Sequence, residues 1–196
     1  LETLKPDIVI NATGYNNVDA AEVKKDAAVS VNVTANAFLA TAALQEKAFY
    51  ITYSTDYVFD GHKSSPYIEG DQTNPLNVYG QTKLDGETVI ANSGVNHLIL
   101  RTASVYSLRR PCFLTSFLKK TEQGTQIQVR SDLVGSPTSA RYLAEMTTQI
   151  ISMAGDKHYE WLSERKGLYH LAGNGMASRY EWAQEIRDTL KLNVEI

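Results

Sequence analysis

Short apolar segments alternate with longer amphipathic segments along the first half of the chain. Three continuous apolar runs, at residues 7–12, 48–54 and 97–102, are typical of strands that are buried on both faces. An alanine-rich segment at 26–47 shows apolar residues near helical spacing, and a second helix is predicted at 78–91. Strand, crossover helix and strand in succession predict a parallel sheet with right-handed crossovers, which is an α/β fold.

The second half of the chain loses this regular alternation. It predicts, in order, helix 113–122, strand 126–129, loop 133–138, helix 139–153, strand 168–172 and helix 178–190. We therefore expect a Rossmann-like, doubly wound parallel sheet in residues 1–105 and a smaller C-terminal cap in residues 106–196. One strand of the cap has the length to return to the main sheet.

Composition narrows the function classes. The 196 residues carry a net charge of −3, which argues against nucleic acid as the main partner. No apolar run approaches the roughly 20 residues of a spanning helix, so no membrane association is expected. Cys112 is the single cysteine and the four histidines are scattered, so neither a disulfide framework nor a metal site is predicted. A cytoplasmic location fits this composition.

Candidate chemistry gathers at the end of the second predicted strand and in the helix that follows it. The strand ends in Ser54, Thr55 and Asp56. Active-site residues of open α/β sheets lie at the carboxyl ends of strands, which is where these side chains fall. Tyr79 and Lys83 are four residues apart and share one face of the next helix.

A carbonyl reductase can use these groups together. An ammonium lowers the pKa of a nearby phenol from its usual value of about 10. Lys83 would thus help Tyr79 to protonate a developing alkoxide, while the Thr55 hydroxyl hydrogen-bonds the reacting oxygen. Each motif alone also fits a surface helix or an ordinary polar turn. Their combination favours a reductase of the short-chain dehydrogenase type.

Five segments in a fixed order resemble one family. They include Val-Asp-Ala-Ala-Glu and Tyr-Val-Phe-Asp-Gly, and the full set lies at 11–15, 18–22, 54–61, 75–83 and 135–138. From about residue 5 to residue 190 the chain resembles the dTDP-4-dehydrorhamnose reductase family of extended short-chain dehydrogenases. The resemblance implies reduction of a 4-keto-6-deoxy sugar nucleotide by NADPH or NADH, giving dTDP-L-rhamnose. It also implies a substrate-binding role for the cap and leaves a homodimer open.

The resemblance assigns roles to single residues. Tyr79 resembles the proton donor, Lys83 the partner that lowers its pKa and contacts the cofactor ribose, and Thr55 the hydroxyl that orients the sugar carbonyl. Cofactor contacts are implied for Gly14, Tyr15, Asn16, Tyr53, Tyr79 and Lys83. Substrate contacts are implied for Thr55, Asp56 and Ser104.

Two positions depart from the family's pattern. The family's Trp in Arg-Thr-Ala-Trp-Val-Tyr-Gly, which would pack on the sugar, is Ser104 here, and the Gln before the Gly-x-Pro-Thr loop is Leu133. Two alternatives stay open: a non-catalytic subunit like the regulatory subunit of methionine adenosyltransferase, and a related sugar-nucleotide epimerase or dehydratase. The choice between NADPH and NADH is open as well.

A glycine-rich turn between a strand and a helix usually binds the cofactor diphosphate in a Rossmann fold, and none precedes Asp7. We therefore expect a fragment without its N-terminal βαβ part, inactive as it stands. Gly173-Asn174-Gly175 also comes between a strand and a helix. There, Ser178 and Glu181 predict a capping box, which explains the helix start without a ligand.

Overall fold

The computed structural model describes residues 1, 3–124 and 126–196. They form two compact units, each described here by itself. The first unit comprises residues 1–101 and 149–170, and the second comprises residues 102–148 and 171–196.

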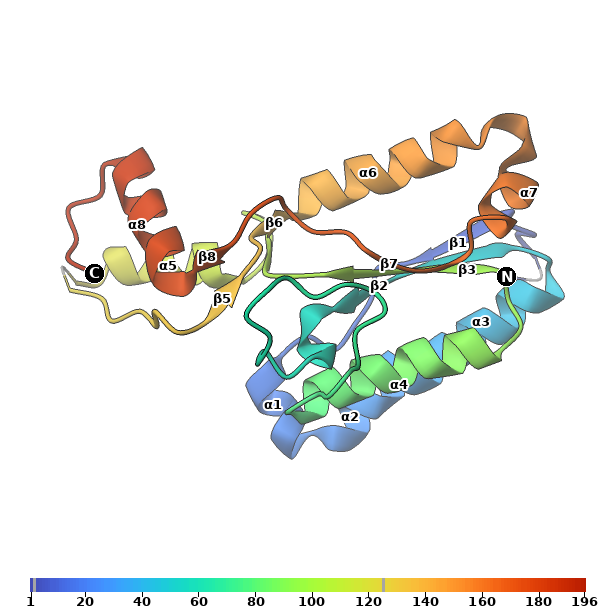
Figure 1. The fold of residues 1–196 in the computed structure, drawn as a ribbon, viewed down its shortest axis with the longest axis horizontal. Helices are drawn as coiled ribbons and strands as arrows, with labels where there is room; N and C mark the ends of the chain where they lie inside the picture. The colour runs from blue at the N-terminus through green and yellow to red at the C-terminus, as the bar shows by residue number, and fades with distance from the viewer. Residues whose placement is uncertain (2, 125) are drawn as a thin grey trace. The chain divides into compact units, whose positions relative to one another are not determined.

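A four-stranded sheet with the order β1-β2-β3-β7 forms the centre of the first unit (Figure 1). Its strands are β1 (Ile8–Asn11), β2 (Phe49–Thr55), β3 (His97–Thr102) and β7 (Gly167–His170). β1 pairs with β2 in parallel, and β3 pairs with β7 in parallel. This architecture confirms the Rossmann-like α/β fold.

The division into units differs from a single boundary at residue 105. The chain returns to the first unit after residue 148, where β7 adds a parallel strand beside β3 with Leu98 opposite Gly167. Helix α6 (Ala140–Met153) carries the chain across this division. A cut into two continuous segments would therefore remove one strand from the main sheet.

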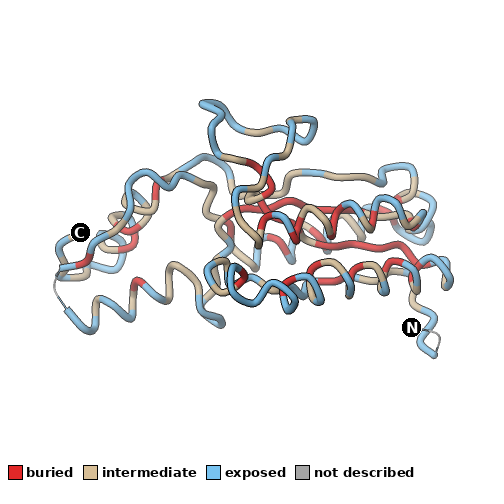
Figure 2. Tube along the Cα trace, turned by 90° about the horizontal axis from the view of Figure 1, so that it is seen from below, coloured by how far each residue is buried: buried red, intermediate tan, exposed pale blue. Residues whose placement is uncertain are grey.

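Helices cover both faces of this sheet (Figure 1). On one face lie α1 (Val18–Val23), α2 (Lys25–Val29), the π-helical turn η1 (Ser30–Thr34), α3 (Ala35–Gln45) and α4 (Val78–Asn92), while the other face carries the short 3₁₀ turn η3 (Gly155–Lys157) and α7 (His158–Ser163). The predicted helix at 26–47 is confirmed in extent, although a π turn interrupts it. The small side chains of Ala28, Ala40 and Ala43 are fully buried, so this helix packs closely (Figure 2).

The stretch Lys25–Gln45 is long and apolar enough to cross a membrane by length and composition alone. It is not an uninterrupted apolar run, because Ser, Asn and Thr residues are spread along it. The helix packs against α4. Its inward face buries the hydrogen-bonded side chains of Asn32 and Asn36. One face of this helix therefore packs into the first unit, while its other face, with Phe38 and Leu44, is exposed.

Two glycines bring α4 close to its neighbours. A methyl group at Gly80 would lie 2.2 Å from the Tyr57 carbonyl oxygen, and one at Gly86 would lie 2.3 Å from the Asn32 carbonyl oxygen. The helix starts at Asn77, whose side chain accepts from the Gly80 amide at 2.7 Å as an N-cap. Asn77 thus sets where α4 begins, and the two glycines allow its close approach to Tyr57 and Asn32.

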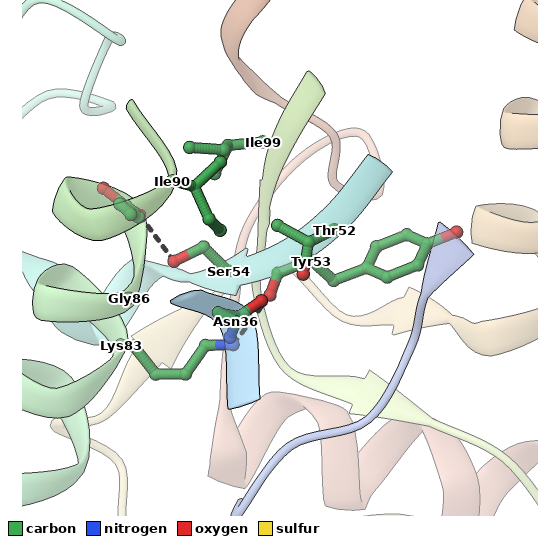
Figure 3. A pocket seen from close by; sticks show the side chains of 9 residues that line it. Asn36, Thr52, Tyr53, Ser54, Lys83, Gly86, Ile90 and Ile99 are labelled. Atoms are coloured by element: carbon green, nitrogen blue, oxygen red, sulfur yellow. Dashed lines mark hydrogen bonds between the residues drawn. The ribbon is translucent and has the colours of Figure 1, made fainter. Parts of the chain in front are cut away.

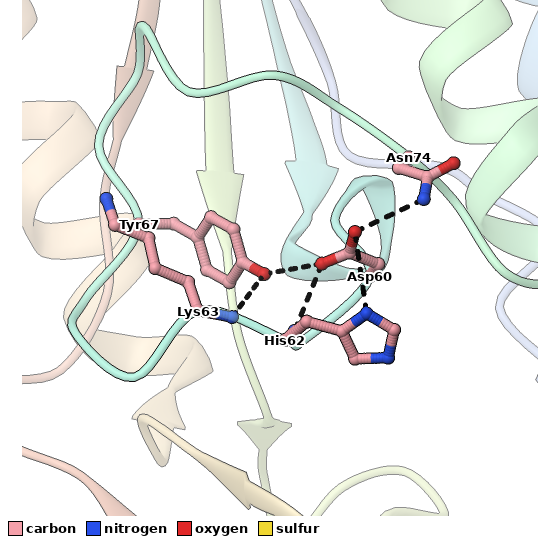
Figure 4. Close-up of polar contacts among 5 residues, drawn as sticks. All are labelled: Asp60, His62, Lys63, Tyr67 and Asn74. Carbon is pink, nitrogen blue, oxygen red and sulfur yellow. Dashed lines mark hydrogen bonds and ion pairs between the residues drawn. The ribbon is translucent and has the colours of Figure 1, made fainter.

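The turn-rich segment between β2 and α4 is held by Asp60 (Figure 4). Its carboxylate accepts hydrogen bonds from the His62 amide at 3.0 Å, the Tyr67 hydroxyl at 2.8 Å and the Asn74 side chain at 3.2 Å. These bonds, that of His62 first, lower the pKa of Asp60 to about 2. The Tyr67 ring also stacks on Phe59, with 4.2 Å between ring centroids. One short side chain thus organises this long loop.

The second unit contains short strand pairs and two further helices. β4 (Val105–Tyr106) pairs in parallel with β6 (Thr138–Ser139), and β5 (Val134–Gly135) pairs antiparallel with β8 (Ala177–Ser178). The helices are α5 (Phe113–Thr121) and α8 (Arg179–Leu190). These helices confirm the predictions at 113–122 and 178–190.

Two local predictions in the second unit were wrong. Of the predicted strand 126–129, only Gln126 forms a bridge, to Glu195, among the described residues. The segment 133–138, predicted as a loop, contains β5 and the first residue of β6. Such short pairs depend on tertiary partners rather than on a local apolar pattern.

Candidate active site

The strand end and the helix singled out by the sequence lie together in the first unit. Thr55 is the last residue of β2, Asp56 follows it, and Tyr79 stands in the first turn of α4. The Thr55 hydroxyl lies close enough to the Tyr79 phenol to affect its pKa. It donates a hydrogen bond to Asp56 Oδ1 at 3.1 Å. A hydroxyl, a phenol and a carboxylate therefore meet at the carboxyl end of a central strand.

The Tyr79 phenol holds its proton firmly. Burial, together with the smaller effects of Asp56 and Tyr57, raises the pKa of Tyr79 to about 12, and the Thr55 hydroxyl opposes them. The Tyr57 ring stands edge-on at 5.5 Å between centroids. The direction is opposite to the lowering that we expected from Lys83. At neutral pH Tyr79 is thus a protonated group, available as a proton donor.

Lys83 makes its main contact with the strand rather than with Tyr79. Its Nζ donates to the Tyr53 carbonyl oxygen at 2.7 Å, and Figure 3 shows the side chain reaching from α4 toward β2. The residue is buried. Burial lowers the pKa of Lys83 to about 8, while the Glu87 charge works in the opposite direction. Spacing on one helix face therefore placed Lys83 beside the strand that carries Thr55, and in this structure its amine contacts the Tyr53 carbonyl.

Behind Lys83 lies a buried ion pair. Arg101 on β3 donates to the Glu87 carboxylate through Nε at 2.9 Å and Nη2 at 2.6 Å. The Ser54 hydroxyl donates to the same carboxylate at 2.5 Å. The side chains of Glu87 and Arg101 are 7% and 6% exposed, so this charge pair is almost entirely removed from water.

A small cavity separates α4 from the sheet at this point (Figure 3). Its volume is about 10 Å³. This is space for about one water molecule. It is lined by Asn36, Thr52, Tyr53, Ser54, Lys83, Gly86, Glu87, Ile90 and Ile99. A cofactor or sugar nucleotide cannot fit inside it, so either would have to bind on the open side of the strand end.

The loop after β1 is held against α4 by Asn32. The Asn32 side chain accepts from the Tyr15 amide at 2.8 Å and donates to the Tyr15 carbonyl at 3.0 Å. It also donates to the Thr82 hydroxyl, in the residue before Lys83, at 3.0 Å. Gly14 and Asn16, on either side of Tyr15, are exposed. This loop, with Tyr53 on β2, presents the residues for which a cofactor contact was predicted.

Ser104 belongs to the second unit. Its φ of 47° puts it in the left-handed region, and its carbonyl accepts from the Thr138 amide at 3.3 Å. The turn between β3 and β4 is thus built around this residue. Its predicted substrate contact stays a prediction.

The family comparison decides the identity of the chain. The sequence model of the family described as the RmlD substrate binding domain matches residues 1–195. The chain belongs to this family. The resemblance seen in its motifs is thereby confirmed.

Curated relatives of this RmlD-family chain are named dTDP-4-dehydrorhamnose reductase. The one from Burkholderia thailandensis is 39% identical over 192 residues, which cover 95% of this chain and 62% of the relative. The one from Escherichia coli strain K12 is 38% identical over 183 residues, which cover 93% and 60%. The chain thus spans about three-fifths of the length of these relatives.

Solved structures share the fold of this RmlD-family chain. A dTDP-4-dehydrorhamnose reductase from Clostridium acetobutylicum matches with a TM-score of 0.90 and 31% identity, covering 99% of this chain and 65% of that one. The enzyme from Bacillus anthracis, solved in complex with NADP, also matches with a TM-score of 0.90, at 28% identity, covering 99% and 66%.

Sequence reasoning missed three residues that hold the candidate site together in this structure: Asn32, Glu87 and Arg101. One signal was available, because a charge inside an apolar strand such as Leu98–Arg101 requires a buried partner. The predicted capping box is confirmed, since Ser178 and Glu181 exchange hydrogen bonds at 2.7 and 3.1 Å. In the described part of the chain, no group of three His, Cys, Asp or Glu residues could hold a metal ion.

Proposed function

We propose that the complete protein carrying this chain is an NAD(P)H-dependent reductase of a 4-keto-6-deoxy sugar nucleotide, of the dTDP-4-dehydrorhamnose type. The contact between Thr55 and Tyr79, with Lys83 one helical turn further, carries the proposal. Relatives named dTDP-4-dehydrorhamnose reductase support the substrate class, and the NADP complex of the Bacillus anthracis enzyme supports the cofactor.

The ends of β1 and β2 suit the nicotinamide-ribose end of a dinucleotide. The Lys83 amine and the Tyr79 phenol offer polar hydrogens there, and Asn32 fixes the main chain of Tyr15 beside them. NADPH or NADH supplies, when bound, the hydride that reduces the sugar carbonyl. We assign no diphosphate contact to Gly173–Gly175, since the helix that follows is already capped by Ser178.

Side chains of this chain then carry out the proton transfer. Reduction of the carbonyl leaves a developing alkoxide, and the protonated Tyr79 donates its proton to that oxygen. The phenolate that remains is unfavourable in this partly buried place. We assign its stabilisation to the Lys83 ammonium, and the orientation of the sugar oxygen to the Thr55 hydroxyl.

Turnover of dTDP-4-dehydrorhamnose by the complete protein tests the proposal against its alternatives. We expect NADPH to be oxidised in equal amount to the sugar reduced, with the product identified by NMR. An epimerase or dehydratase would convert the sugar without net oxidation of NADPH. A regulatory subunit would do neither, and either outcome would contradict the proposal.

We also expect the complete protein to be a cytoplasmic homodimer. The resemblance leaves the dimer open, and the composition of the chain supports the location. Light scattering measures the mass of the particle in solution, and cell fractionation measures where the protein resides.

A further inference from the structure

A buried carboxylate joins three elements of the first unit behind the proposed active site. Glu87 on α4 binds Arg101 on β3 through two hydrogen bonds, and it accepts a third from Ser54 on β2. Ser54 immediately precedes Thr55, and Lys83 lies one helical turn before Glu87. The carboxylate is therefore linked to both sides of the proposed chemistry.

A contribution to the stability of the fold is a weak explanation for the presence of this ion pair. Removing two charges from water costs much of what their attraction returns, and apolar residues of similar volume are often as stabilising. Arg101 Nη1 is buried without a hydrogen-bond partner among the described residues, and the guanidinium packs 5.0 Å from the Phe59 ring centroid. A buried donor without a partner calls for an explanation other than stability.

The charged groups around Glu87 show how its carboxylate affects the pKa of Lys83. Lys83 faces it from α4 and Arg101 from β3, while the uncharged Ser54 of β2 and Asn36 of α3 line the same cavity. Arg101 thus binds the carboxylate directly, whereas the Lys83 ammonium is bonded to the Tyr53 carbonyl and interacts with Glu87 only through its charge. Glu87 raises the pKa of Lys83 against the larger, lowering effect of burial.

The charge of Arg101 also affects a second carboxylate, that of Glu69. The pKa of Glu69 is lowered mainly by the hydrogen bond that its carboxylate accepts from the His170 amide at 2.8 Å, and the charges of His170 and Arg101 add to this. Glu69 is exposed. It therefore cannot replace Glu87 as the buried partner of Arg101.

We propose that Glu87 is a positioning residue of the proposed active site, acting through Ser54 on the strand end that carries Thr55 and along α4 on Lys83. The inference rests on the proposed function for its kinetic readout. The carboxylate fixes the main chain just before Thr55. Its negative charge also keeps the Lys83 ammonium protonated to higher pH than burial alone would allow.

Glu87→Gln in the complete protein tests the charge, because Gln has nearly the same shape. We expect the alkaline limb of kcat/KM to move to lower pH by about one unit, the size of shift that a nearby charge produces. The double variant Glu87→Gln/Arg101→Met removes the unpaired guanidinium and should show the same shift, so the test holds if the single variant does not fold. An unmoved limb in the folded protein would overturn the inference.

Ser54→Ala tests the link to the strand. We expect kcat to fall several-fold with an unchanged alkaline limb, because the charge of Glu87 remains. A wild-type kcat would show that Glu87 does not act on the strand end through Ser54. Glu145→Gln is the matched control, since Glu145 pairs with Arg141 on the exposed surface of α6 and its loss should change neither quantity.

A labelling experiment separates this inference from the proposed function. The rate at which acetic anhydride modifies Lys83 depends on its unprotonated fraction, and mass spectrometry of the Lys83 peptide follows it against pH without turnover. The midpoint should move to lower pH in Glu87→Gln. An unchanged midpoint overturns the inference even if reduction is observed, and a moved midpoint supports it even if the protein reduces no sugar nucleotide.

Discussion

The two units of the chain bury different kinds of side chains. The first unit buries charged groups, Lys83, Glu87 and Arg101, together with several hydrogen-bonded asparagines. Among its described residues, the second unit buries no charged side chain, and its polar buried groups are Thr and Ser. Its core instead gathers aromatic rings, with Trp182 at 5.4 Å from Tyr106 between centroids.

Both departures from the family's motifs fall in the second unit, which also carries the matching segment at 135–138. Thr55, Tyr79 and Lys83 match and belong to the first unit, whereas Ser104 and Leu133 depart and belong to the second. Under the proposed function, we expect changes in the first unit to act mainly on kcat and changes at Ser104 in the second unit to act mainly on KM. Variants of the complete protein test this difference between the two units.

The largest effect is expected for Tyr79→Phe in the first unit. Removing the phenolic hydroxyl while keeping the ring should lower kcat by about 10²- to 10⁴-fold, the usual effect of losing a general acid. The Kd for NADPH, measured by fluorescence, should change little. Tyr142→Phe, at an exposed position on α6, is the matched control. Near wild-type turnover by Tyr79→Phe would show that Tyr79 is not the proton donor.

A smaller loss is expected for Thr55→Val, which keeps the shape and removes the hydroxyl beside Tyr79. Loss of one donor to a reacting oxygen costs about 10²- to 10³-fold in kcat. Thr55→Ser restores a hydroxyl and should recover most of that loss. Equal activity of the Val and Ser variants in steady-state assays would show that the hydroxyl does not act in catalysis.

The pH profile should follow Lys83. Since burial lowers the pKa of Lys83 to about 8 and the ammonium is the active form, kcat/KM should be full below that pH and fall above it. Tyr79 stays protonated through this range because its pKa is about 12. Lys83→Met should abolish the limb along with most activity. A profile that stays flat well above pH 8 would contradict the role of Lys83.

The smallest effect is expected in the second unit, for Ser104→Trp. An aromatic contact with the sugar contributes roughly 0.5–1.5 kcal/mol, so KM should fall by about 2- to 10-fold while kcat stays unchanged. Val105→Trp adds the same bulk next to it, at an exposed position, and should not lower KM. A rise in KM, with good turnover of another keto-sugar nucleotide by the wild type, would indicate a different substrate.

The layered fold could be predicted because its elements follow local patterns. The strands around 7–12, 48–54 and 97–102 end within one residue of the predictions. The site's strand and helix were identified for the same reason, since Thr55 ends a buried strand and Tyr79 opens a helix. The short pairs of the second unit carry no such pattern, and the strand predicted at 126–129 was wrong.

The partners inside the site could not be predicted from spacing alone. Helical periodicity places Lys83 near Tyr79, but only the packing of α4 on β2 shows that its amine meets the Tyr53 carbonyl. The same packing buries Tyr79 and raises its pKa, against our expectation. The double contact of Asn32 with Tyr15 depends on where the π turn falls in a long helix.

The most direct test of the central claim is a crystal structure of the complete protein with NADP⁺ and the reduced sugar nucleotide. We predict that the nicotinamide lies at the carboxyl ends of β1 and β2. The Tyr79 hydroxyl should lie about 2.6–3.2 Å from the sugar oxygen formed by reduction, as a proton donor must. A nicotinamide bound away from Thr55 and Tyr79, or a dinucleotide seated on the turn at Gly173–Gly175, would contradict the account.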